Sequence, residues 1–232
     1  MKKSDQLHEN QRRNFLKQFA TGAAVLGTGI LSAPLAASAA NLSSPNVAGA
    51  DEWFNKIKGK HRMVFDVTQP HEIMPFAWPK VYMMTNAATG SSKDDTTAVV
   101  IFRHNAIPYA MNNDLWAKYK FGEMFKINDA ENKGPATANP FWQPAAGTFK
   151  APGLGEVKIG INELQDDGVL FGACDIALTV FSAVVAMGSK GDPDAIKKEW
   201  LAGILPGVQV MPSGIWAVGR AQEHGCGYCF AG

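Results

Sequence analysis

The chain has 232 residues with 22 basic and 21 acidic side chains, which gives a formal net charge of +1. This near balance argues against a nucleic-acid-binding protein, because such a protein needs a concentrated basic face. Three cysteines are too few for a fold that disulfides hold together.

The first 39 residues have the pattern of a twin-arginine signal peptide. Arg12 and Arg13 begin it, a weakly hydrophobic stretch runs from 19 to 35, and the small residues at 37–39 are typical of a cleavage site. A membrane anchor is the alternative, but glycines and a proline interrupt an apolar run that falls short of the ~20 residues of a span. We therefore expect folded export to the periplasm. Without the five basic and two acidic residues of this segment, the mature chain has 17 basic and 19 acidic residues and is expected to contain no membrane span.

Residues 40–58 are expected to form a flexible leader and a short helix, and residues 59–232 a single domain. Apolar and β-branched runs predict the strands of this domain, and capping residues predict its helices. The first half is expected to contain strands at 62–68 and 97–102, a proline-delayed helix to 84 after the first strand, and a helix from 113 to about 125 after the second. A short helix within 155–165 and a strand from 169 to Cys174 follow. Helices at 175–187 and 192–205, a strand at 208–211 and a helix at 213–224 complete the expected order. No element is predicted for 226–231. This alternation predicts one open, mainly parallel sheet with helices on both faces, because parallel neighbours need crossover helices.

Residues 128–152 contain prolines and glycines and little periodicity. A loop of this length is usually functional or mobile, so we expect either a lid or oligomer contact that presents Phe141 and Trp142, or a surface insertion that packs these rings onto the body.

Side chains with useful chemistry follow the predicted strands. His71 follows the first strand, His104 and Asn105 follow the second, and Cys174 ends the third. Ligands of open α/β sheets bind beyond the carboxyl ends of the strands, so these residues are expected at one site. Asp175 then begins an apolar helix, whose free N–H groups favour a thiolate on Cys174, and a histidine could hold that thiolate or accept its proton. The alternative is a packed core cysteine.

Cys226 and Cys229 have the spacing of a thiol-disulfide oxidoreductase, but only three residues follow them and no helix can form there. We expect a disulfide or a pair that resolves Cys174. Alternatively, the two thiols could join Cys174 and a histidine around zinc or copper. No other cofactor is expected.

Several segments of the chain match the pattern of one family. They are Asp66-Val67-Thr68, the apolar strand at 98–102, LQDDGVLFGACDIAL at 164–178 and LPGVQVMPSGIWAVGRAQEHG at 205–225. On these segments the chain resembles the DsrE/DsrF-like family of sulfur-relay proteins, in its exported twin-arginine branch. Residues 128–152 and the Cys226/Cys229 ending depart from the pattern.

The resemblance implies a three-layer α/β/α sandwich with a mainly parallel, roughly five-stranded sheet, and assembly into trimers or hexamers. It also implies a cysteine, matched by Cys174, that carries sulfur as a persulfide between a sulfur donor and an acceptor. The first functional hypothesis is therefore a periplasmic sulfur-handling protein. The alternatives are a non-catalytic metal or small-ligand binding module, and a structural subunit whose helix at 176–187 is an oligomer contact.

Overall fold

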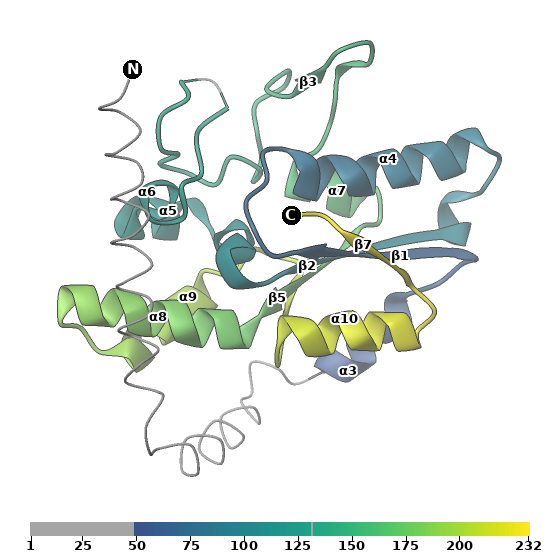
Figure 1. Cartoon of the computed structure of the whole chain (residues 1–232). Coiled ribbons are helices and arrows are strands. Elements are labelled where there is room, and N and C mark those ends of the chain that lie inside the picture. The colour runs from purple at the N-terminus through teal and green to yellow at the C-terminus, as the bar shows by residue number, and fades with distance from the viewer. Residues whose placement is uncertain (1–48, 131) are drawn as a thin grey trace, which may run out of the picture. The chain divides into compact units, whose positions relative to one another are not determined.

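Strand β2 (Thr96–Phe102) is the centre of a five-stranded sheet, and every one of its residues is buried. It lies between β1 (His61–Val67) and β5 (Leu170–Cys174), and the order across the sheet is β6-β5-β2-β1-β7, with β6 at Val208–Met211 and β7 at Gly227–Phe230. All neighbouring strands are parallel, so their carboxyl ends share one edge (Figure 1). This computed structural model describes residues 49–130 and 132–232. The predicted signal peptide at 1–39 and most of the leader lie outside the described residues.

Helices cover both faces of the sheet. Helix α4 (Met74–Ala88) and the short α7 (Ile161–Asp166) lie on one face, whereas α10 (Gly214–Glu223) and α3 (Ala50–Trp53) lie on the other (Figure 1). The long α8 (Asp175–Ser189) follows β5 directly and packs against α9 (Pro193–Ala202). The predicted α/β sandwich with a mainly parallel, five-stranded sheet is confirmed.

Alternation along the strands divides the buried residues between two cores. Phe65 of β1 faces the larger core beneath α4, and its neighbour Val64 faces the smaller core beneath α10. Side chains of adjacent strand residues point to opposite faces, so one strand supplies both cores.

The structure differs from the predicted elements in three places. The helix expected from 113 to 125 is two helices, α5 (Asn113–Tyr119) and α6 (Phe121–Phe125), because Lys120 between them has a left-handed backbone with φ of 52°. A small hairpin, β3 (Lys150–Ala151) with β4 (Gly155–Glu156), stands where the short helix was expected to begin. The chain end forms β7, which pairs with β1. Short 3₁₀ helices complete the fold: η2 (Phe54–Lys56), η3 (Lys93–Asp95) and η4 (His104–Ala110).

The long loop packs its first aromatic side chain into the larger core. Phe141 is 3% exposed, and its ring stacks on Phe76 of α4 at 3.9 Å and on Phe149 at 4.8 Å between centroids. Asn139 fixes the loop from within, since its side chain donates to the carbonyl oxygens of Tyr109 and Met111. Phe141 is therefore part of the core, as the surface-insertion alternative predicts.

Candidate functional site

The sulfur of Cys174 lies where the first turns of two helices meet. Cys174 ends β5, caps the start of α8 and is 5% exposed. Its Sγ accepts a hydrogen bond from the backbone N–H of Ala177 at 3.3 Å. The N–H groups of Ile176, in the same helix, and of Gly214, the first residue of α10, lie near enough to lower the pKa of the thiol. Backbone N–H groups at the starts of two helices therefore act on one sulfur atom.

Burial and these donors act in opposite directions on the pKa of Cys174. Loss of solvent is the largest effect and raises the pKa, the hydrogen bonds from Ala177, Gly214 and Ile176 lower it, and the Asp175 carboxylate raises it again. The net result is a pKa above that of an ordinary thiol. At neutral pH the resting residue is thus a thiol, and an anion formed on it is stabilised by the helix N–H groups.

Arg103 is the cation beside this sulfur, and Gly214 lies against both side chains. The N–H of Gly214 lowers the pKa of Cys174, and a Cβ built on Gly214 would lie only 2.5 Å from Cβ and 2.7 Å from Cδ of Arg103. A side chain at position 214 would therefore displace Arg103. The hydrogen bond with Asp66 raises the pKa of Arg103, and negative charge on Cys174 adds a smaller increase.

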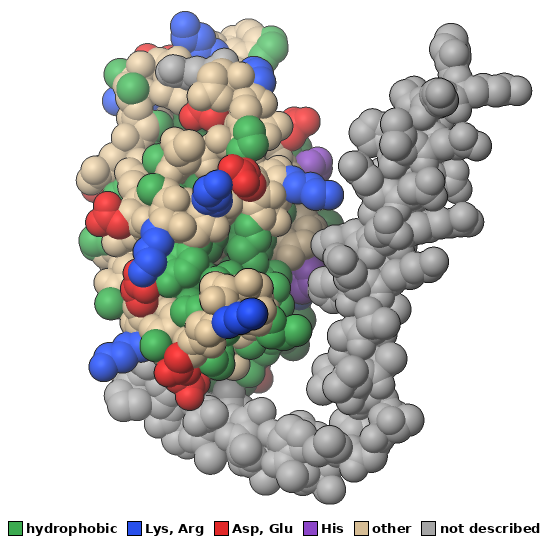
Figure 2. All heavy atoms as spheres, turned by 90° about the vertical axis from the view of Figure 1, so that its left-hand side faces the viewer, with side chains coloured by type: hydrophobic (Ala, Val, Ile, Leu, Met, Phe, Trp, Pro, Cys, Tyr) green, Lys and Arg blue, Asp and Glu red, His purple; other side chains and the backbone are tan. Residues whose placement is uncertain are grey.

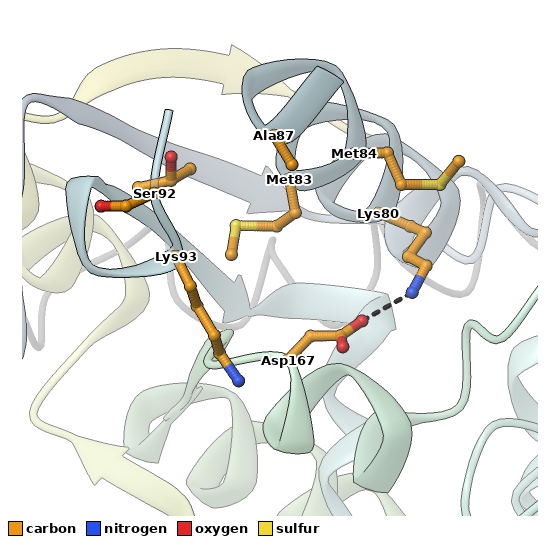
Figure 3. A pocket seen from close by; sticks show the side chains of 8 residues that line it. Lys80, Met83, Met84, Ala87, Ser92, Lys93 and Asp167 are labelled. Atoms are coloured by element: carbon orange, nitrogen blue, oxygen red, sulfur yellow. Dashed lines mark hydrogen bonds and ion pairs between the residues drawn. The ribbon is translucent and has the colours of Figure 1, made fainter. Parts of the chain in front are cut away.

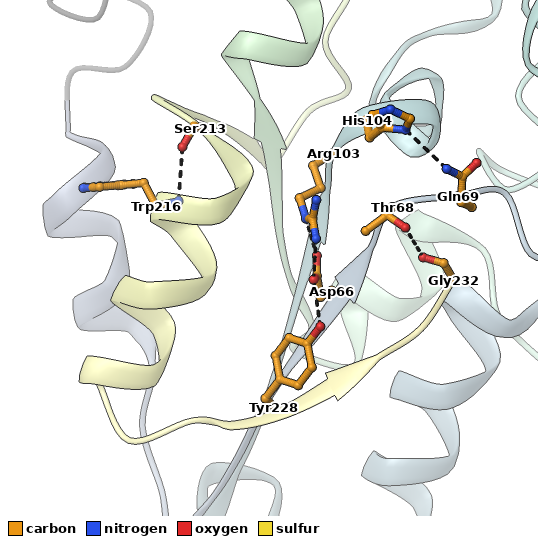
Figure 4. A network of polar contacts seen from close by, with 9 residues as sticks. All are labelled: Asp66, Thr68, Gln69, Arg103, His104, Ser213, Trp216, Tyr228 and Gly232. Carbon is orange, nitrogen blue, oxygen red and sulfur yellow. Dashed lines mark hydrogen bonds and ion pairs between the residues drawn. The ribbon is translucent and has the colours of Figure 1, made fainter. Parts of the chain in front are cut away.

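The guanidinium of Arg103 is fixed by a buried carboxylate. Its Nε and Nη2 donate to the two oxygens of Asp66 at 2.6 and 2.8 Å, and the hydroxyl of Tyr228 donates to the same carboxylate at 2.9 Å (Figure 4). Asp66 is 2% exposed, so its charge is compensated by Arg103 rather than by water. Strands β1 and β7 and the residue after β2 together hold this group of side chains.

His104 lies at the same edge of the sheet but bonds elsewhere. Its Nδ1 is 3.3 Å from Nε2 of Gln69 (Figure 4). The Oε1 of Gln69 accepts a hydrogen bond from Asn105 at 2.8 Å. Its ring also contacts Phe181 of α8, with 6.1 Å between centroids. The φ of His104 is 51°, an uncommon value for a residue with a side chain, and it begins η4.

His71 lies beside the last residue of the chain. Gly232 packs against it, and the carbonyl of Gly232 accepts hydrogen bonds from the N–H groups of Thr68 and Gln69 at 2.8 and 3.1 Å. Among the hydrogen bonds of the described residues, none joins Cys174 to His71 or His104. The histidines and Cys174 share an edge of the sheet, but the structure places Arg103, not a histidine, against the helix start that binds the sulfur.

Asp175 is buried next to Cys174 and pairs with α9. One carboxylate oxygen, Oδ2, accepts a hydrogen bond from Nζ of Lys197 at 2.8 Å, and the residue is 2% exposed. The other oxygen, Oδ1, is buried and has no hydrogen-bond partner within the described part of the chain. This pair joins the first turn of α8 to α9 close to the sulfur.

The sheet separates the two C-terminal thiols. Cys229 is opposite Phe65 in the register of β7 with β1 and packs on the larger core, whereas Cys226 is buried in the smaller core with Val64. All three cysteines are free, so the predicted disulfide is not formed. Burial raises the pKa of Cys226 to about 11 and also raises that of Cys229. In residues 49–130 and 132–232, no three or more His, Cys, Asp or Glu side chains are grouped to hold a metal ion.

A cavity of about 240 Å³ opens at the opposite end of β2, away from Cys174. Lys80, Met83 and Lys93 line it, as does Thr96, the first residue of the strand (Figure 3). Both ammonium groups are occupied within the protein, since Lys80 pairs with Asp167 at 2.6 Å and Lys93 donates to a backbone carbonyl. The cavity therefore offers mainly methionine and lysine hydrocarbon to a ligand.

Sequence reasoning missed three side chains of the site, namely Arg103, Asp66 and Tyr228. Arg103 was detectable as the residue directly before His104 at the same strand end. Tyr228 was not, because its role depends on the pairing of β7 with β1.

No helix among the described residues has the length and apolar content needed to cross a membrane. Comparison of the chain with models of protein families, with curated proteins and with solved structures found no match.

Proposed function

We propose that this protein takes up sulfane sulfur as a persulfide on Cys174 and passes it to a partner thiol. One observation carries the proposal: Cys174 caps α8 and its Sγ accepts a hydrogen bond from the N–H of Ala177, while the N–H of Gly214 at the start of α10 also lowers the pKa of the thiol. Such donors, at the positive ends of two helices, stabilise a negatively charged sulfur. A cysteine that serves only as core packing does not need them.

The proposed reaction begins when the Cys174 thiolate attacks the sulfane sulfur of a donor R–S–SH. A bond forms between Sγ and that sulfur, the S–S bond of the donor breaks, and the electron pair leaves on R–S⁻. Cys174 then carries –S–SH. Attack of an acceptor thiolate on the outer sulfur transfers it and restores the Cys174 thiolate, so the sulfane sulfur moves between thiols without an external oxidant.

The raised pKa of Cys174 gives a proton acceptor a role in the first step. An uncharged thiol is a poor nucleophile, and reaction requires that its proton leave. Assistance by His104 or His71 remains a prediction, since neither imidazole hydrogen-bonds to the sulfur in the described residues. The backbone donors and Arg103 stabilise the anion once it has formed.

Exposed apolar side chains adjoin the sulfur and extend along α8. Ile176 and Ile215, which are 38% and 65% exposed, lie beside the helix starts that bind Sγ. Val180, Val184 and Met187 continue the apolar stripe, and hydrophobic side chains gather around the end of α8 in Figure 2. Large exposed apolar patches mark interaction surfaces. The stripe supports the expected trimer or hexamer. Sedimentation of the wild type and of a Val180→Asp/Val184→Asp variant tests this assembly.

A periplasmic location is also proposed, from the twin-arginine sequence alone.

Sulfur transfer tests the proposed function. The protein is incubated with polysulfide, freed of excess reagent and mixed with a small acceptor thiol, and the sulfane sulfur released is measured. We expect release by the wild type and by a Cys226→Ala/Cys229→Ala variant, and none by Cys174→Ser. Equal release by Cys174→Ser would refute the proposal.

A further inference from the structure

We infer that Arg103 is a binding residue for an anionic group beside Cys174, so that the preferred sulfur donors are anions such as hydropolysulfides or low-molecular-weight persulfides with a carboxylate. That the bound anion is a sulfur donor rests on the proposed function. The anion site itself rests on the packing of Gly214 against Arg103 and on the hydrogen bonds of the guanidinium, with the electrostatic effect of Cys174 on Arg103 in support. Asp66 and Tyr228 are positioning residues that fix the guanidinium.

Arg103 and Cys174 lie close together at one edge of the sheet. Phe102 pairs with Ala173 in the register of β2 with β5, so Arg103 and Cys174 follow adjacent residues of neighbouring strands. Gly214 packs against the Cβ, Cγ and Cδ atoms of Arg103, and its N–H lowers the pKa of Cys174. The two side chains thus adjoin the same residue at the start of α10, and negative charge on Cys174 is felt at the guanidinium.

Arg103 has one donor group, Nη1, that Asp66 does not bind. Nε and Nη2 of Arg103 donate to Asp66, and no hydrogen bond from Nη1 is found in the described part of the chain. The side chain of Arg103 is 23% exposed, whereas that of Asp66 is 3% exposed. One edge of the guanidinium is therefore fixed by a buried partner, and the other has an NH₂ group that a solute can reach. Arginine with donors in a fixed plane is well suited to carboxylates and similar anions.

The carboxylates near Cys174 are each paired with a cation. The ionisable groups that surround this region are Asp66, Tyr228, Asp175 and Lys197, in addition to Arg103. Tyr228 is neutral because burial, followed by its hydrogen bond to Asp66, raises its pKa. Asp66 is paired with Arg103, and Asp175 is paired with Lys197 at 2.8 Å. Each carboxylate thus has a cation as its partner, although Asp175 still raises the pKa of Cys174, and the outward edge of Arg103 is left for an anion.

The test compares two alkylating reagents that differ in charge. Iodoacetate is an anion and iodoacetamide is neutral, and each forms a thioether with Cys174 that mass spectrometry of the digested protein assigns to this residue. The ratio of the two labelling rates at one fixed pH reports the electrostatic attraction, because differences in thiol ionisation affect both reagents alike. In Arg103→Gln we expect the iodoacetate to iodoacetamide ratio to fall about five- to tenfold, the order of magnitude for unit charges about 4 Å apart in water, because the guanidinium edge that a solute reaches is exposed. Arg103→Lys should keep most of the ratio.

Controls separate binding from folding. Removal of Arg103 alone leaves Asp66 buried and unpaired, so Asp66→Asn/Arg103→Gln provides a neutral pair in the same place, and it should show the same low ratio. Arg220→Gln removes an exposed arginine from α10 and should leave the ratio unchanged. An unchanged ratio in the double variant overturns the inference, as does a Cys174 that neither reagent labels. Loss of sulfur transfer with a charge-sensitive ratio would refute the relay function and leave the anion site standing.

Discussion

Replacing Asp66 by asparagine removes the charge that fixes Arg103. The carboxylate receives both donors of the guanidinium edge at 2.6 and 2.8 Å and the Tyr228 hydroxyl at 2.9 Å, whereas an amide has one acceptor oxygen and directs its NH₂ at the remaining donors. Breaking a buried ion pair costs ~3–5 kcal/mol. Because the Arg103 side chain is 23% exposed, water compensates part of this loss, and we expect a decrease of about 2–3 kcal/mol in the free energy of unfolding.

Thermal and urea unfolding measure this decrease. For a domain of this size ~1 kcal/mol corresponds to about 2–4 °C, so Tm should fall by about 4–12 °C. The matched control is Asp167→Asn, which breaks the more exposed pair with Lys80 and should cost less than ~1 kcal/mol. Tyr228→Phe should be destabilising in the wild type and less so in Asp66→Asn, since both changes affect one hydrogen-bond group. The double-mutant cycle of Asp66→Asn and Tyr228→Phe measures this coupling. The reasoning would be refuted if Asp66→Asn had a Tm within 2 °C of the wild type and the effects of the two substitutions on stability were additive.

Further predictions concern the thiols and the residue between Arg103 and the sulfur. Gly214→Ala should lower stability by ~1–3 kcal/mol and slow alkylation of Cys174, because the new methyl group overlaps Arg103; thermal unfolding and labelling kinetics check this. The rate of Cys174 alkylation in folded protein should keep rising through pH 9, since burial raises its pKa above that value, and a plateau below pH 8 would contradict the burial argument. Cys229 should react with a neutral maleimide faster than Cys226, which is 6% exposed and has a pKa of about 11. Equal rates in the folded protein would contradict the burial of Cys226.

The parts of the fold that follow from local pattern were predictable. The apolar run of β2 required a central strand, and the junction of an apolar run with Asp175 placed Cys174 between a strand and a helix. The terminal strand β7 was not predictable, because its four residues include a glycine and only pairing with β1 defines them. The break at Lys120 was missed for a similar reason, since lysine gives no signal for a left-handed backbone.

The sequence predicted which edge of the sheet holds the site. It did not predict which side chains contact one another there. Strand ends correctly placed Cys174 and His104 at one edge of the sheet. The partner of Arg103 is 37 positions away along the chain, and the glycine that packs on it begins a helix far downstream. Such contacts depend on tertiary packing, which periodicity and spacing do not encode.

Site-resolved mass spectrometry of polysulfide-treated protein tests the central claim most directly. The folded protein is treated, blocked with a thiol reagent and digested, and each cysteine peptide is examined for the mass of one added sulfur atom. We predict this mass on Cys174, with Cys226, whose pKa burial raises to about 11 and which has no backbone N–H among the groups that lower it, as the internal control that lacks it. An unmodified Cys174, under conditions in which a small-molecule thiol gains sulfur, would contradict the account.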